Sequence, residues 1–134
     1  MSGAASRLRR FGRDEAGATA VEFAIVCLPL LLVIFGILDF GRALNARNDL
    51  GYAAGVASRR VLVDPGLSDA DLEQAVRDAF SSGDPAQLQI AVGTQTGGGT
   101  NFRTLSVTYP FTFLLVPALD GTITLDVARK IPVK

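Results

Sequence analysis

The chain has 134 residues, enough for one domain, and its 13 basic residues balance 13 acidic ones. A formal net charge of zero gives no global attraction to nucleic acid, so we expect no nucleic-acid partner. The sequence contains no histidine, the commonest general base and metal ligand. Its only cysteine, Cys27, can form neither an intrachain disulfide nor a thiolate metal cluster. We therefore predict no catalytic residues, no cofactor and no metal site.

A long apolar segment dominates the first third of the chain. The stretch Phe23–Leu38 has no charged side chain, and it extends back to Ala16 with Glu22 as its single charge. A helix needs about 20 apolar residues to cross the hydrocarbon core of a bilayer. Proline is tolerated in such helices, so Pro29 does not exclude a span. We predict a transmembrane helix over residues 18–38.

The charges that flank this helix predict its orientation. Four arginines precede it: Arg7, Arg9, Arg10 and Arg13. The first stretch after it holds only Arg42 and Arg47. Because a basic excess marks the cytoplasmic side, we expect residues 1–17 to be a cytoplasmic leader and residues 39–134 to be exported to the periplasm. No A-x-A pattern closely follows Leu38, so cleavage by ordinary signal peptidase is not expected.

A carboxylate within an apolar helix is costly, so Glu22 needs an explanation. Its side chain could reach the aqueous interface, or it could have a specific cationic partner. The residues around it, Gly17–Phe23, read GATAVEF. This segment resembles the prepilin peptidase site of type IV pilin-like proteins.

The longer string that begins at Gly17, GATAVEFAIVCLPLLLVIFGILDFGRAL, is similar to the N-terminal signature of TadE-like pseudopilins of bacterial Tad pili. The resemblance implies cleavage after Gly17, a new N-terminus at Ala18, and an assembly role for Glu22 and Phe23. It implies a minor pilin-like component of the Tad pilus and secretion machinery in the bacterial inner membrane. The implied partners are the prepilin peptidase, the major pilin, other pseudopilins and inner-membrane lipid. A role in adhesion follows only by analogy.

Elementary electrostatics is consistent with the implied spacing. Cleavage after Gly17 would create an α-amine on Ala18, one helical turn from Glu22. Such an amine has a pKa of about 7.7–8.0 in water and is largely protonated at neutral pH. In a bundle of these helices the amine of one subunit could pair with Glu22 of its neighbour, and unpaired charges would penalise a wrong register.

Two other classes of function deserve comparison. An uncleaved membrane anchor whose exported domain binds a partner would keep its full length and would be indifferent to changes at Gly17. An exported enzyme is disfavoured by the residue types, because the chain has no histidine and no cysteine outside the apolar segment.

The helical pattern continues beyond the membrane segment. Apolar residues recur at three- and four-residue intervals: Phe40, Ala43, Leu44, Leu50, Ala54, Ala57 and Val61. We therefore expect one helix from about Thr19 to Leu62, with a transmembrane half and an amphipathic half. Within it, Gly51 and Gly55 form a G-x-x-x-G pattern, which could pack closely on the chain's own sheet or on a helix of another subunit.

A shorter second helix is predicted from Asp69 to Ser81, with Ser68 as its N-cap. Alternation with a period of two then predicts three strands, around 87–92, 104–111 and 122–127. Residues 97–101 (GGGTN) predict a flexible hairpin loop. The fold class is thus membrane-anchored α+β, with a long N-terminal helix, a short second helix and a small three-stranded antiparallel sheet.

One apolar segment of the predicted domain has two interpretations. Pro110–Pro117 could be a buried strand edge with its loop, or an exposed patch that docks on a neighbouring subunit or on the bilayer surface.

Overall fold

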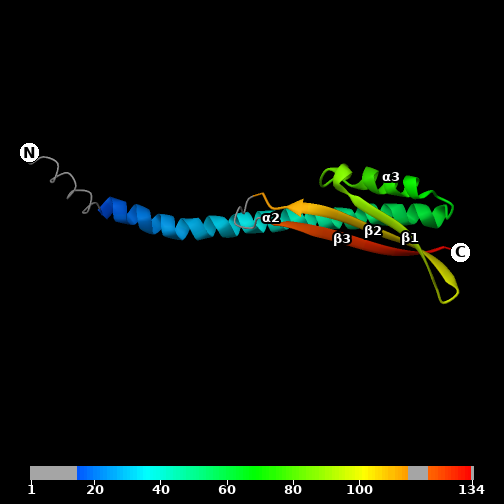
Figure 1. Ribbon diagram of the computed structural model, residues 1–134. Coiled ribbons are helices and arrows are strands. Elements are labelled where there is room, and N and C mark those ends of the chain that lie inside the picture. Colours follow the sequence, from blue (N-terminus) through cyan, green and yellow to red (C-terminus); the bar gives the residue numbers. More distant parts are fainter. Residues whose placement is uncertain (1–14, 115–120, 134) are drawn as a thin grey trace, which may run out of the picture. The chain divides into compact units, whose positions relative to one another are not determined.

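The computed structural model describes residues 15–114 and 121–133, and Figure 1 shows its elements. The chain divides into two compact units, Met1–Ile37 and Leu38–Lys134. The predicted fold class is confirmed, because a long apolar helix is followed by a short helix and a three-stranded antiparallel sheet. Residues 1–14 of the predicted leader and 115–117 of the apolar segment lie outside the described residues.

Helix α2 runs from Glu15 to Val63, so it begins four residues before the predicted start and ends one residue later. Pro29 lies inside it. In the first unit most of the large apolar side chains are exposed, and Phe23 is 70% exposed. A window of α2 is long and apolar enough to cross a membrane, and none of that window is buried. A core helix of a soluble protein would be mostly buried, so α2 suggests a membrane anchor by length, composition and exposure.

In the second unit α2 presents one buried stripe. The stripe consists of Ala43, Ala46, Leu50, Ala53, Ala54, Ala57 and Val61. Most of these side chains are alanines, so the helix can lie close to the elements that cover it. The sequence-based assignment of Phe40 and Leu44 to this stripe is wrong, since they are 68% and 47% exposed. Asp39 takes the buried position where this stripe begins. Because each residue of a helix is rotated about 100° from the one before it, Phe40 is turned away from the buried face.

A short turn joins α2 to α3, which runs from Asp69 to Ala79. The N–H of Gly66 donates to the Asp64 carboxylate at 3.0 Å. Ser68 caps α3 as predicted, because its hydroxyl accepts the N–H of Asp71 at 3.1 Å. The helix ends two residues before the predicted Ser81, and a short 3₁₀ turn, η1 (Pro85–Gln87), follows that the sequence did not predict.

The sheet has the order β1-β2-β3 and is antiparallel throughout, with β1 over Gln89–Gly97, β2 over Thr100–Thr112 and β3 over Thr122–Val133. All three strands are longer than predicted, and the glycine segment is a tight turn rather than a flexible loop. Gly97 pairs with Thr100, and only Gly98 and Gly99 connect the strands. Both have positive φ, 62° and 79°, which a two-residue hairpin turn requires and glycine adopts without strain.

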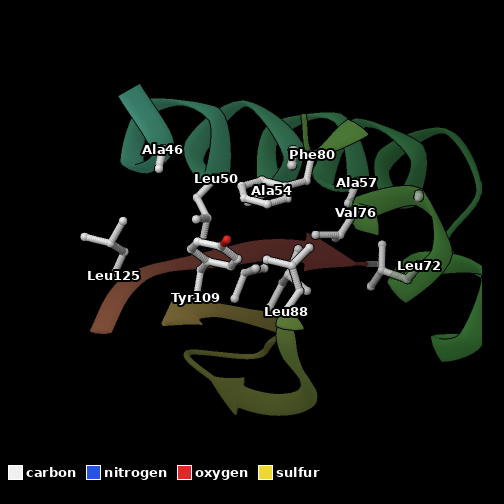
Figure 2. Packing of buried hydrophobic residues seen from close by; sticks show 14 of the residues in the cluster. Ala46, Leu50, Ala54, Ala57, Leu72, Val76, Phe80, Leu88, Tyr109 and Leu125 are labelled. Atoms are coloured by element: carbon white, nitrogen blue, oxygen red, sulfur yellow. The ribbon is translucent and has the colours of Figure 1, made fainter. Parts of the chain in front are cut away.

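Buried side chains from α2, α3 and the sheet meet in one apolar cluster, and Figure 2 shows ten of them labelled. Val76 of α3 and Leu105 and Val107 of β2 are almost fully buried. The ring of Phe80, just after α3, lies 5.0 Å from the ring of Tyr109 on β2, at an interplanar angle of 52°. The core therefore joins the end of α3 to the middle of the sheet and to the alanine stripe of α2.

Candidate functional site

The predicted processing site lies in the first turns of α2. Gly17, Ala18 and Glu22 are all helical and exposed. Residues four apart on a helix are neighbours on its surface, so Ala18 and Glu22 share one face. Among residues 15–114 and 121–133, no cation forms an ion pair with Glu22. Its carboxylate is therefore accessible to a partner from outside the described chain. Phe23, next to it, is also exposed.

The other end of the apolar segment contains a buried carboxylate. Asp39 is 0% exposed, and the Arg42 guanidinium donates to its Oδ1 at 2.7 Å. The backbone N–H of Leu114, just beyond β2, donates to the same oxygen at 3.4 Å. Asp39 lies near the beginning of the second unit, and it thus connects α2 to Leu114, 75 residues later in the chain and just beyond the end of β2. A carboxylate needs such partners when it is buried, because desolvation penalises an unpaired charge.

Two aromatic rings complete this cluster. The guanidinium carbon of Arg42 lies 5.3 Å from the centre of the Phe111 ring, a cation–π geometry. Phe113 packs edge-on against Phe111, with 5.6 Å between the ring centres. Asp39 and Arg42 of the DFGR segment therefore hold the end of β2 in place, whereas Phe40 faces outward.

A second carboxylate of α2 anchors the loop that follows α3. The N–H groups of Ser81 and Ser82 donate to Asp49 Oδ2 at 2.6 and 2.7 Å. Burial raises the pKa of Asp49, but the hydrogen bonds from both serines outweigh this effect and leave the pKa below its usual 3.8. Asn45, one turn earlier, donates to the Ser82 hydroxyl at 3.1 Å. The ionised carboxylate thus fixes this loop to α2.

The G-x-x-x-G pattern does not pack on the chain's own sheet, so that interpretation is wrong. A Cβ atom added at Gly51 or Gly55 would meet no described atom within 4 Å beyond the helix's own backbone. A shallow groove of about 270 Å³ lies here, lined by Gly51, Tyr52, Gly55, Val56 and Arg59. A contact with a helix of another subunit stays a prediction.

The described part of the chain shows no cluster of metal-ligating side chains. No three His, Cys, Asp or Glu side chains gather closely enough there to hold a metal ion. The free thiol of Cys27 lies in the apolar part of α2. The contacts that the geometry does bring together are those of Asp39, Arg42 and Asp49 of α2 with the end of β2 and with the loop after α3.

A family model matches the part of the chain that forms most of α2. Residues 17–59 fit the model of the family described as TadE-like protein. This segment is TadE-like. The predicted resemblance is confirmed over that range, and it associates the chain with Tad pili, whose components serve structure and assembly. No curated protein and no solved structure matches the chain.

The TadE-like segment contains all the residues that the sequence analysis selected: Gly17, Ala18, Glu22, Phe23 and the DFGR motif. It ends before α3 and the sheet, so the family match does not extend to them. The processing role of Gly17 and Ala18 and the register role of Glu22 and Phe23 stay predictions.

Sequence reasoning missed the partners of the TadE-like segment in the rest of the chain. The contacts of Asp39 with Leu114 and of Asp49 with the serine loop join residues that are 75 and 32 positions apart. No local pattern marks these pairs. The one available signal was the position of Asp39, an acidic residue at the exact end of an apolar run, where a partner is needed.

Proposed function

We propose that this chain is a minor pilin-like subunit of the Tad pilus machinery, and that prepilin peptidase matures it between Gly17 and Ala18. In this proposal residues 1–17 form a cytoplasmic leader, residues 18–38 span the inner membrane, and residues 39–134 lie in the periplasm. The mature helix then assembles laterally with the helices of the major pilin and other pseudopilins.

The observation that carries the proposal is the head of α2 within the TadE-like match. Gly17 lies in the first turn of an exposed apolar helix, and the exposed Glu22 lies one turn beyond Ala18. The 21 residues from 18 to 38 extend about 31 Å at about 1.5 Å per residue, close to the roughly 30 Å of a hydrocarbon core. The carboxylate would then lie near the cytoplasmic edge of the core, where its insertion cost is lower than at the centre.

The first test is the N-terminus of the protein from cells with and without prepilin peptidase, determined by intact mass. We expect a chain that starts at Ala18 and depends on the peptidase. Gly17→Ala should abolish or strongly slow the cut, because the peptidase must accommodate the added methyl group at the cleavage site. Gly36→Ala is the matched control, since it adds the same group to the same helix at a position where no described atom beyond the helix's own backbone lies within 4 Å.

Equal cleavage of the Gly17→Ala and Gly36→Ala variants would contradict the assigned site. A full-length chain in both strains would support the alternative, an uncleaved membrane anchor whose exported domain binds a partner. Neither of these two results by itself tests whether the helix spans the membrane.

The register role of Glu22 has its own test. Glu22→Gln removes the charge but keeps the size, so membrane insertion should persist while copurification with other pilins and pilus output fall. Glu73→Gln, on α3 and outside the apolar segment, is the matched control and should leave both unchanged. Wild-type pilus output from the Glu22→Gln variant would remove the register argument.

A further inference from the structure

Large apolar side chains remain exposed where the second unit begins. Phe40 is 68% exposed, Leu44 is 47% exposed and Leu114 is 67% exposed. None of them belongs to the apolar core of the unit. Single exposed apolar residues are ordinary, but these three occur together at one end of one unit.

All three lie at nearly the same level along α2. At about 1.5 Å per residue, Phe40 and Leu44 lie about 3 and 9 Å beyond Leu38, the last residue of the apolar run. Leu114 belongs to this level because its N–H lies 3.4 Å from the carboxylate of Asp39. A bilayer has a polar interfacial region of roughly 5–8 Å outside its hydrocarbon core. A helix that leaves the core at Leu38 therefore places Phe40 and Leu114 in that region and Leu44 at its outer edge.

The polar groups at this level are arranged to suit the same environment. Asp39, the charge nearest to the core, is turned inward and paired. The Arg42 side chain is 44% exposed, and its fork of N–H donors exceeds what the single contact with Asp39 uses. Aromatic and arginine side chains with apolar stems are typical of membrane interfaces, where rings lie at the headgroup level and guanidinium groups reach phosphate.

We infer that Phe40, Arg42, Leu44 and Leu114 form an interfacial belt that seats the near end of the exported unit in the headgroup layer of the membrane. The inference rests on the proposed membrane span. The belt does not need to share one face of the unit, because lipid surrounds the span on every side before it assembles with other helices. The continuity of the belt with the apolar run, which the chain itself enforces, identifies lipid rather than a protein as its occupant.

The belt also gives the contact between Asp39 and Leu114 a second consequence. The end of β2 is held at the level of the helix exit, so the sheet has two attachments near the bilayer, α2 itself and the segment after Phe111. Two attachments restrict rocking of the unit about the helix exit, which a single flexible connection would permit.

The chain contains no tryptophan, so a single introduced tryptophan reports on one position. We would reconstitute the full chain into phosphatidylcholine–phosphatidylglycerol vesicles and measure quenching by lipids brominated either high or low on the acyl chain. The belt variants are Phe40→Trp and Leu114→Trp. Leu31→Trp reports on the span, and Leu62→Trp, which is 58% exposed near the far end of α2, is the matched control outside the belt.

We expect Leu31→Trp to be quenched mainly by deep bromines, both belt variants mainly by shallow bromines with blue-shifted emission, and Leu62→Trp by neither. Quenching of Leu31→Trp without quenching of both belt variants would overturn the belt while leaving the proposed anchor intact. Absence of quenching at Leu31→Trp would overturn the span and the belt together. Leu44→Trp, at a belt position that is 47% exposed, repeats the test if Leu114→Trp melts below the wild type.

Discussion

Gly83 offers the sharpest test of how the second unit is packed. A Cβ atom added there would lie 2.1 Å from Oη and 2.7 Å from Cζ of Tyr109. The tyrosine cannot easily move away, because it is only 9% exposed and its ring packs against Phe80. Gly83 does not have a positive φ, so its backbone suits alanine and the whole cost of Gly83→Ala comes from this collision.

The size of the effect is best read against Gly55→Ala, where the added methyl group meets no described atom within 4 Å. Both substitutions lower the conformational entropy of the unfolded chain, a gain of about 0.4–1 kcal/mol each. The difference between their free energies of unfolding therefore isolates the collision. Overpacking of this kind costs about 1–3 kcal/mol, so Gly83→Ala should be less stable than Gly55→Ala by that amount.

The assay is thermal unfolding of the full chain in detergent micelles, followed by near-ultraviolet circular dichroism, which reports on packed tyrosine and phenylalanine. For a unit of this size each kcal/mol corresponds to about 4–8 °C in Tm. We expect Gly83→Ala to melt at least about 4 °C below Gly55→Ala. Adding Tyr109→Phe removes the closest colliding atom and should recover part of the difference. Equal melting temperatures for Gly83→Ala and Gly55→Ala would refute the packing that we describe.

Three further predictions concern polar contacts. Asp39→Ala should lower the free energy of unfolding by about 1.5–3 kcal/mol, the range for hydrogen bonds to a charged group. Asp126→Ala, at an exposed strand position, is the control and should change it by less than about 0.5 kcal/mol. Because the folded pKa of Asp49 lies below its unfolded value, its contribution should be complete above pH 3.8 and should decline as the pH falls through the folded pKa. An acid titration of stability should show this decline, and in Asp49→Asn it should be smaller. Arg103→Ala should lower the free energy of unfolding by about 0.5–1.5 kcal/mol, because the guanidinium no longer donates to the Leu67 carbonyl. Asp69→Ala should lower it by less, since the Asp69 carboxylate is 67% exposed and surface ion pairs contribute little. Equal urea midpoints for the two variants would contradict this ranking.

The groove at Gly51 and Gly55 shows where a pattern in the sequence needed the structure to interpret it. The spacing of the two glycines indicates a close approach of another backbone, but it does not say which one. The structure excludes the chain's own sheet, because both glycines face open space. The structure thus removes one of the two interpretations, and contact with a helix of another subunit stays a prediction.

Phe40 illustrates the same distinction for burial. Periodicity identified an apolar face on the second part of α2 and assigned Ala43, Leu50 and Ala54 to it correctly. It also included Phe40, because an apolar side chain that faces lipid and one that faces a protein core look alike in the sequence. Only the position of the sheet, which covers Asp39 and leaves Phe40 exposed, separates the two.

The sequence by itself determined the apolar helix, the Ser68 cap, the three alternating strands and the TadE-like head of the chain, because each depends on the spacing of residues that are neighbours along the chain. The tertiary structure decided which carboxylates are paired, which glycines are open and which apolar residues remain exposed. Those properties depend on where the end of β2 and the loop after α3 meet α2, with partners up to 75 residues apart. Local periodicity carries no information about such distant pairs, since they form only when the sheet packs against the helix.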